Sequence, residues 1–145
     1  MPEASAVTVV TLRAAARRVE DMLRARARAH GMGLSEALLL YGLWSHQGCA
    51  SPPQVGAEVM LSPSAVRAAG GRLERRGMVE RRAAADGRRR ACLALTEQGE
   101  RLAATVADFF VEVEGWMRAQ LSEEQHRVLL QGLLLAGDPR GWWPS

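Results

Sequence analysis

Apolar positions recur at helical spacing in the first third and the last third of the chain, and at strand spacing between them. From residue 8 to residue 30 the apolar side chains are separated by four, three and four positions: Leu12, Ala16, Val19 and Leu23. This spacing places them on one face of a helix. Gly31 and Gly33 predict the end of that helix, because glycine favours helix termini.

Three shorter helices are predicted next from their capping signals. Ser35 predicts an N-cap for a helix that ends at Gly48, with these side chains facing the core: Leu38, Leu39, Leu43 and Trp44. Ser51-Pro52 and Ser62-Pro63 each combine a capping hydroxyl with a proline at the first helical position. Two short helices separated by a tight turn predict a helix-turn-helix.

The second helix of this pair has two distinct faces. Its inner positions are predicted to be Val66, Ala69, Gly70 and Leu73. Its outer positions are then Ser64, Arg67, Ala68, Gly71 and Arg75. The Gly70-Gly71 pair weakens the helix by about 1 kcal/mol per glycine. Either this helix tightens only on a ligand or the glycines permit close backbone packing, and we favour packing.

After Gly77 the apolar period changes to two, which predicts a β-hairpin over residues 78–95 with Asp86-Gly87 in its turn. Thr96 is expected to cap a long helix with a heptad-like apolar seam: Leu102, Val106, Phe109, Val113 and Trp116. Ser122 and Gln125 predict a capping box for a last helix whose apolar positions are Val128, Leu129, Leu133 and Leu134. The heptad-like seam from Leu102 to Trp116 predicts that another helix packs against it.

Charge is concentrated in one segment of the chain. The 145 residues carry a net charge of +3, whereas residues 62–90 hold nine arginines against Glu74, Glu80 and Asp86, a net +6. The remaining residues therefore sum to −3. A local cationic cluster favours a polyanionic partner such as nucleic acid.

Length and composition predict one globular domain, since 48% of the residues are hydrophobic and 24% are charged. No apolar run approaches the roughly 20 residues that span a bilayer, and the N-terminus lacks the pattern of a secretory signal. We therefore expect a soluble cytoplasmic protein with no membrane association. All 19 basic side chains are arginine, which suggests a GC-rich bacterial source.

The sequence favours neither catalysis nor a metal site. Cys49 and Cys92 stand far apart without a CxxC pair, so free, partly buried thiols are the favoured interpretation and a redox switch is the alternative. The three histidines lack metal-ligand spacing. We find no nucleophile beside a base, and we expect no cofactor and no enzymatic activity.

Residues 34–96 contain three linked motifs, namely the run VGAEVMLSPSAVRAAGGRLERRGMVERR, the turn ADGRRR and the closing LALTEQG. In this order and spacing they resemble the MarR family of bacterial regulators, and the flanking helices also follow the family's order. It departs at Ala65, where the family often has Ser or Thr, and at Ala68, where it often has Arg. In the wing, the family's Arg falls on Arg89, but its Asp position holds Gly87.

The resemblance implies a mostly helical winged helix-turn-helix with a small β-wing, dimerised through its N- and C-terminal helices. Residues 1–33 would form a dimerisation helix, residues 34–96 the DNA-binding region (helix-turn-helix about 52–76, wing about 78–95), and residues 97–145 the C-terminal dimerisation helices and tail. The predicted interface residues are Leu12, Val19, Leu23, Val106, Phe109, Val113, Trp116, Leu129 and Leu133.

The resemblance also implies the sites. Recognition-helix contacts to double-stranded DNA are expected from Ser64, Ala65, Arg67, Ala68, Arg72 and Arg75, and wing contacts from Arg88, Arg89 and Arg90. Arg67 is the first choice for base recognition, because an early position in the helix can present a guanidinium to guanine. A small aromatic or anionic effector would bind near His30, Trp44, His46, Trp116 or His126.

These observations predict a ligand-responsive repressor that binds a pseudo-palindromic operator as a homodimer. Two alternatives stay open. The first is a winged-helix dimer that acts as a protein-interaction or non-specific DNA-binding module, which the short side chains of Ala65 and Ala68 suggest. The second is a thiol-based redox-sensing repressor that uses Cys49 or Cys92.

Overall fold

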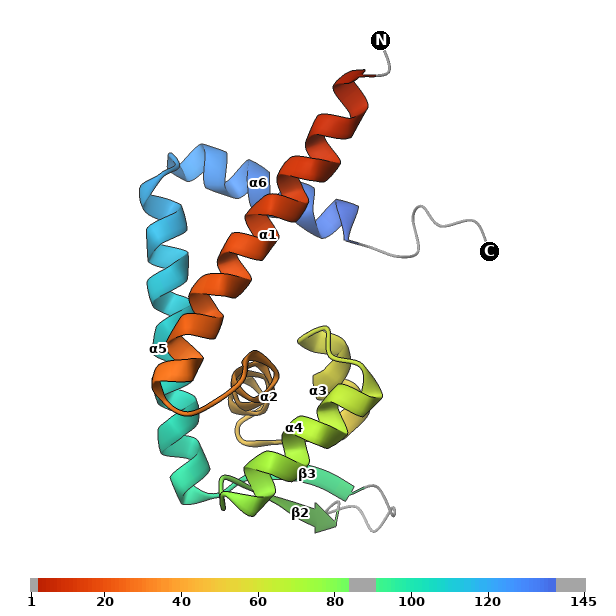
Figure 1. Cartoon of the computed structure of the whole chain (residues 1–145), viewed down its shortest axis with the longest axis vertical. Helices are drawn as coiled ribbons and strands as arrows, with labels where there is room; N and C mark the ends of the chain where they lie inside the picture. Colours follow the sequence, from red (N-terminus) through yellow and green to blue (C-terminus); the bar gives the residue numbers. More distant parts are fainter. Residues whose placement is uncertain (1–2, 84–90, 138–145) are drawn as a thin grey trace, which may run out of the picture. The chain divides into compact units, whose positions relative to one another are not determined.

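The computed structural model describes residues 3–83 and 91–137, with six helices and three strands in those ranges. The chain divides into two compact units, Met1–Phe110 and Val111–Ser145. The first unit holds α1 (Glu3–Ala29), α2 (Leu34–Ser45), α3 (Pro52–Glu58), α4 (Pro63–Arg75), the sheet, and the start of α5 (Glu97–Ala119) (Figure 1). The second unit holds the end of α5 and α6 (Glu123–Ala136).

Helix α2 is the centre of the first unit, where it contacts α1, α3, α4, β1 and β3. Its side chains Leu39, Leu40 and Leu43 are fully buried. Burial of an aliphatic side chain of this size contributes about 1.5–3 kcal/mol, so α2 is the main apolar support on which α4 is placed. Two sequence expectations are wrong here. Gly33, not Ser35, is the N-cap residue of α2, and Trp44 is 46% exposed instead of facing the core.

The capping signals of the helix-turn-helix are confirmed. The Ser51 hydroxyl accepts a hydrogen bond from the Gln54 amide at 3.3 Å, and the Ser62 hydroxyl accepts one from the Ala65 amide at 3.1 Å. These two caps start α3 and α4 at the predicted residues. Helix α4 buries the four predicted inner residues, Val66, Ala69, Gly70 and Leu73.

The glycine pair lies inside a continuous helix. A Cβ at Gly70 would lie 3.7 Å from Leu93 and 3.8 Å from Leu39, and a Cβ at Gly71 would lie 3.5 Å from the Arg75 guanidinium. These are ordinary van der Waals distances, so the packing of α4 does not require glycine at either position. Close backbone packing occurs instead at Gly99, where a Cβ would overlap the Met78 carbonyl.

The wing strands form where the period-two pattern predicts them, and a third strand joins them. The sheet has the order β1-β3-β2, with β1 (Cys49–Ala50), β2 (Val79–Ala83) and β3 (Ala91–Leu95) paired antiparallel. Gly77, with φ at +72°, ends α4 and turns the chain into β2. The predicted Asp86-Gly87 turn lies outside the described residues.

The favoured interpretation of two free thiols is wrong, because Cys49 and Cys92 form a disulfide between β1 and β3. Strand β1 contains only two residues and carries no alternating pattern, so the sequence gives no signal that brings Cys49 beside the wing. The register explains the contact. Cys49 pairs with Ala94, and Cys92 lies two residues along β3 from Ala94 on the same face of the strand.

Helices α5 and α6 begin at the predicted caps. The Thr96 hydroxyl accepts a hydrogen bond from the Gly99 amide at 3.0 Å, and Ser122 forms a capping box with Gln125. Four of the residues predicted for a dimer interface are buried: Leu23, Val106, Phe109 and Val113. The other five are at least partly exposed: Leu12, Val19, Trp116, Leu129 and Leu133. No residue of α6 is buried in the structure of this single chain.

Candidate nucleic-acid interface

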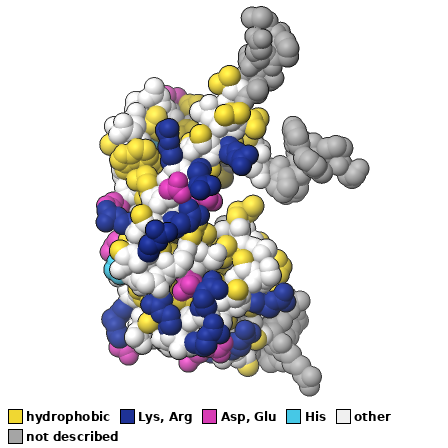
Figure 2. All heavy atoms as spheres, in the orientation of Figure 1, with side chains coloured by type: hydrophobic (Ala, Val, Ile, Leu, Met, Phe, Trp, Pro, Cys, Tyr) yellow, Lys and Arg dark blue, Asp and Glu magenta, His cyan; other side chains and the backbone are white. Residues whose placement is uncertain are grey.

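The outer face of α4 presents polar and cationic side chains. Ser64, Arg67, Ala68 and Arg75 are exposed, and Ala65 is half-buried. Within the described part of the chain, neither Arg67 nor Arg75 has a carboxylate partner. Figure 2 shows arginine side chains on the face that carries α4 and β2, with acidic side chains among them. Arg67 and Arg75 are therefore available to an external anion.

Arg72 has a different environment from the one its sequence position suggests. Its Nε donates to Glu36 Oε1 at 2.8 Å, and Arg76 Nη1 lies 3.5 Å from Glu36 Oε2. Glu36 is 6% exposed, which makes it the buried charged residue of the described core. A buried carboxylate is tolerated only when cations or hydrogen bonds compensate it. Arg72 and Arg76 thus attach α4 to α2.

Arg76 extends this attachment to the turn after α1. Its guanidinium donates to the Gly31 carbonyl at 3.2 Å and to the His30 carbonyl at 3.5 Å. We call Glu36, Arg72 and Arg76 the Glu36 cluster. Local sequence patterns do not reveal this cluster, because Glu36 precedes Arg72 by 36 residues and no pattern around Glu36 marks it as buried.

The arginines of β2 are paired with carboxylates at the surface. Arg81 lies 3.6 Å from Glu74, and Arg82 contacts Glu80 at 2.7 Å through Nε and at 2.5 Å through Nη2. These exposed pairs reduce the net positive charge that the wing strands offer to a polyanion. The three arginines predicted to contact DNA from the wing, Arg88, Arg89 and Arg90, lie outside the described residues.

The predicted effector residues belong to both units, and each has its own surroundings there. His30 lies against the ring of Phe109 with 5.2 Å between centroids, His46 contacts Glu58, and His126 contacts Glu114 at 2.9 Å. Trp44 lines a small cavity of about 220 Å³ with Gln47, Gly48, Leu95 and Glu100. Trp116 is 49% exposed.

A larger cavity of about 500 Å³ lies beside the outer face of α4. Its walls are mainly apolar and come from α3, α4 and the turn between them, and its polar contributors are Arg67 and Arg81. The cavity is of a size that accommodates a small molecule. None of the predicted effector residues lines it.

Among residues 3–83 and 91–137, none of the helices has both the length and the apolar composition that a membrane span needs. No group of three or more His, Cys, Asp or Glu side chains among these residues is arranged to hold a metal ion.

Comparison with solved structures establishes the fold. MepR of Staphylococcus aureus, in its DNA-binding conformation, is 20% identical with a TM-score of 0.79, and the match covers 89% of this chain and 95% of MepR. The chain has the winged-helix fold of such regulators. A solved MarR family transcription regulator shares this fold with a TM-score of 0.77. The two chains are 19% identical, and the match covers 92% of this chain and 88% of the regulator.

BpsR of Bordetella bronchiseptica, whose DNA binding is regulated by 6-hydroxynicotinic acid, has the same fold at 19% identity and a TM-score of 0.77. That match covers 90% of this chain and 98% of BpsR. No model of a known family matches the sequence, and no curated protein matches it. The fold implied by the sequence resemblance is thus confirmed.

Proposed function

We propose that this chain is a MarR-type transcription regulator that binds duplex DNA as a homodimer. The observation that carries the proposal is the outer face of α4. It is a capped helix in a winged-helix fold, and it presents Ser64, Arg67 and Arg75 without intramolecular carboxylate partners among the described residues. A helix of this kind fits the major groove of B-DNA.

Each exposed side chain has a distinct proposed role. Arg67 lies one turn from the start of α4, where a guanidinium can reach guanine O6 and N7. Ser64 suits a phosphate, because it is exposed in the first turn of α4 and helix N-termini favour anions. Arg75, in the last turn, suits a phosphate contact that positions the protein without reading sequence. The wing arginines Arg88–Arg90 remain proposed minor-groove contacts.

The homodimer is supported by apolar side chains that the single chain leaves exposed. On α6 these are Val128, Leu129, Leu130, Leu133, Leu134 and Leu135, and on α1 they include Val7, Val9, Val10 and Leu12. Soluble proteins seldom leave so many large apolar side chains to water unless another surface covers them. A second copy would also supply the second recognition helix that a pseudo-palindromic operator requires.

The regulatory role proposed is repression relieved by a small aromatic or anionic effector in the cytoplasm. The cavity beside α4 supports this, because a ligand that contacts Arg67 would compete with DNA for the same guanidinium. The regulation of BpsR by 6-hydroxynicotinic acid shows that this fold accommodates control by a small aromatic acid. We propose no catalytic activity and no cofactor.

The alternative function is a winged-helix module that binds DNA without reading its sequence. The methyl groups of Ala65 and Ala68 on α4 favour it, because they offer no hydrogen bond to a base edge. The pairing of Arg81 and Arg82 with carboxylates does not favour either function, since phosphate contact and base contact both need free cations.

Selection of bound duplexes from a random pool separates these two functions. A sequence-reading dimer should enrich a two-fold symmetric motif over random duplex. In that motif, Arg67→Ala should change the ranking of bases at one position of each half-site, a loss of about 1–3 kcal/mol for the preferred base. Arg75→Ala should weaken binding to all sequences alike. It should also lower the slope of log affinity against log salt concentration by about one.

Arg101→Ala, which removes an exposed arginine of α5 paired with Glu97, is the matched control and should alter neither property. If the wild-type protein binds random duplex as tightly as any selected one, the non-specific module is correct. If it binds neither duplex, the proposed function fails.

A further inference from the structure

The Arg76 guanidinium at the end of α4 contacts both α2 and the end of α1. Arg76 is the C-cap residue of α4, and its Nη1 and Nη2 donate to the Gly31 carbonyl at 3.2 Å and the His30 carbonyl at 3.5 Å. Nη1 also donates to Oε2 of Glu36, in the first turn of α2, at 3.5 Å. One planar group therefore joins the ends of two helices to the start of a third.

The end of α1 is a suitable acceptor for this guanidinium. Gly31 has φ at +70°, and the Met32 amide donates to the Ala27 carbonyl at 3.0 Å, so the chain leaves the helix at this turn. The last carbonyls of a helix lack amide partners within the helix and carry partial negative charge. An arginine that donates to carbonyls at this end therefore stabilises the helix terminus as well as the contact.

The Arg76 contacts differ in kind from the packing around them. Helices α1 and α4 both pack against α2, and Leu23 and Ala27 of α1 are buried. Apolar burial is non-directional, whereas hydrogen bonds from a planar guanidinium have a fixed geometry. Packing against α2 thus keeps α1 and α4 together, and Arg76 restricts the direction of α4 relative to α1.

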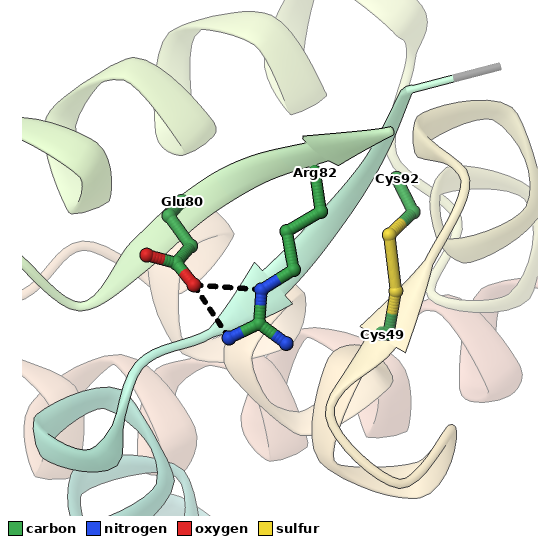
Figure 3. The surroundings of a disulfide bond; sticks show 4 residues. All are labelled: Cys49, Glu80, Arg82 and Cys92. Atoms are coloured by element: carbon green, nitrogen blue, oxygen red, sulfur yellow. Dashed lines mark hydrogen bonds and ion pairs between the residues drawn. A yellow bond between two sulfur atoms is a disulfide. The ribbon is translucent and has the colours of Figure 1, made fainter. Parts of the chain in front are cut away.

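The rest of the DNA-binding region is held by separate contacts. Figure 3 shows the Cys49–Cys92 disulfide, which joins β1 to β3. The Leu95 amide also donates to the Gly48 carbonyl at 2.7 Å. The wing and the helix-turn-helix therefore stay attached to each other when the Arg76 side chain is removed. The effect of its removal falls on the direction of this region relative to α1.

We propose that Arg76 is a positioning residue that sets which separation of two half-sites the protein accepts. The inference rests on the proposed DNA-binding homodimer, in which α1 belongs to the interface. Helix α1 has 27 residues and is about 40 Å long, so a tilt of about 5° at one end displaces the other end by about 3.5 Å. This displacement is about the rise of one base pair. A fixed direction of α4 relative to α1 therefore favours one spacing over its neighbours.

The test compares duplexes that differ only in the distance between their half-sites. The motif selected from the random pool supplies the preferred spacing, and one or two base pairs are inserted or removed at its centre. Each inserted base pair moves the second half-site by about 3.4 Å and rotates it by about 35°. Fluorescence anisotropy at one fixed salt concentration gives the affinity of the full-length protein for each duplex. The spacing ratio is the affinity for the preferred duplex divided by that for an altered one.

In Arg76→Gln the spacing ratio should fall roughly threefold to tenfold below that of wild type, the range expected when a hydrogen-bonded network loses one member. The base preference within each half-site should remain, because Arg67 is unchanged. Arg76→Lys should give an intermediate ratio, since its ammonium keeps the charge but lacks the planar fork.

Arg72→Gln is the matched control, because Arg72 Nε donates to the same carboxylate at 2.8 Å. Within residues 3–83 and 91–137, Arg72 makes no hydrogen bond to the end of α1. Urea denaturation should show a similar loss of stability in Arg72→Gln and Arg76→Gln, whereas the spacing ratio of Arg72→Gln should stay within about twofold of wild type. An equal fall of the ratio in both variants would trace the effect to lost stability and overturn the positioning role.

Hydrogen exchange of the free protein tests the same contact without DNA. Arg76→Gln should raise the exchange rates of the amides of residues 30–33 several-fold, because the turn loses the group that its carbonyls contact. Arg72→Gln should leave these rates unchanged. Unchanged exchange in Arg76→Gln would show that the guanidinium does not hold the turn, and it would overturn the positioning role.

The DNA measurements separate a failure of this inference from a failure of the proposed function. Wild-type protein that binds all spacings equally, or an Arg76→Gln variant with the wild-type spacing ratio, overturns the positioning role while DNA binding persists. The proposed function then survives. Absence of DNA binding in the wild-type protein overturns the function and the positioning role together.

Discussion

At the residue scale, the Glu36 cluster separates the arginines that hold α4 in place from those that face solvent. Glu36 is buried, whereas the side chains of Arg72 and Arg76 retain 45% and 36% exposure. Both arginines can therefore keep part of their hydration while they compensate the carboxylate. The arrangement leaves Arg67 and Arg75 as the unpaired cations of α4 in the described structure, and it fixes the helix that carries them.

Glu36→Gln should destabilise the protein by about 1–2 kcal/mol, because it keeps the shape of the side chain but removes the charge that both guanidinium groups contact. The cost is smaller than for a fully buried pair, since water reaches both arginines. Urea denaturation measures the change. Glu97→Gln, at an exposed ion pair with Arg101, is the control and should stay within about 0.5 kcal/mol of wild type. Equal losses in the two variants would contradict the role of burial.

Local residue signals were readable from the sequence, and distant pairings were not. Ser51, Ser62, Thr96 and Ser122 cap helices as predicted, because a cap depends on residues three positions away. Glu36 reaches its partners across the fold. Since glutamate is almost always exposed, only the packed structure reveals that this one is buried.

At the element scale, α4 combines a well-formed N-terminal cap with an interior that glycine weakens. Gly71 lies in the middle of the helix, and its nearest neighbour is the flexible end of Arg75. Glycine at such a position loses more backbone entropy on folding than alanine does. The lost stability belongs to the helix itself and not to a contact with the rest of the fold.

Gly71→Ala should therefore stabilise the protein by about 0.5–1 kcal/mol. Gly99→Ala is the opposing control in α5. Its Cβ would overlap the backbone carbonyl of Met78, which cannot move aside as a side chain can, so a loss of about 1–3 kcal/mol is expected. Thermal unfolding followed by circular dichroism measures both changes. A destabilised Gly71→Ala protein would show that α4 needs a glycine for a reason outside its own packing.

The long elements followed from periodicity, but the shortest one did not. The long helices and the two wing strands repeat a spacing over enough residues to be recognised, and the seven-residue helix α3 was predicted from its cap. Strand β1 has two residues, Cys49 and Ala50, and no repeat can be detected in so short a segment. The disulfide could not be predicted without this strand, because the β1–β3 register is what brings Cys49 and Cys92 together.

At the scale of the whole molecule, the question is what covers the apolar side chains of α6. The seam predicted on α5 is partly used by the chain itself, because Val106, Phe109 and Val113 are buried. The Phe109→Asp variant would therefore disturb the folding of the single chain as well as the assembly of two chains. The leucines of α6 are better probes, since Leu129 and Leu133 are each 38% exposed and lie one turn apart on the same face.

Leu129→Asp/Leu133→Asp should convert a dimer into a monomer, because two carboxylates would have to be buried or paired at a surface that is otherwise apolar. Sedimentation equilibrium should show one subunit mass in place of two, while the circular dichroism of the helices is retained. The monomer should bind a full two-half-site duplex with a salt slope about half that of wild type, since half the phosphate contacts remain.

Met60→Asp is the matched control. Met60 is 88% exposed in the turn between α3 and α4, so the same change of an apolar side chain to a carboxylate is made away from α6. This variant should sediment as wild type. If the α6 variant also stays dimeric, the second copy is held by other residues, and α1 becomes the element to test. A wild-type protein that sediments as a single subunit would contradict the homodimer directly, because one recognition helix cannot read both halves of a symmetric site.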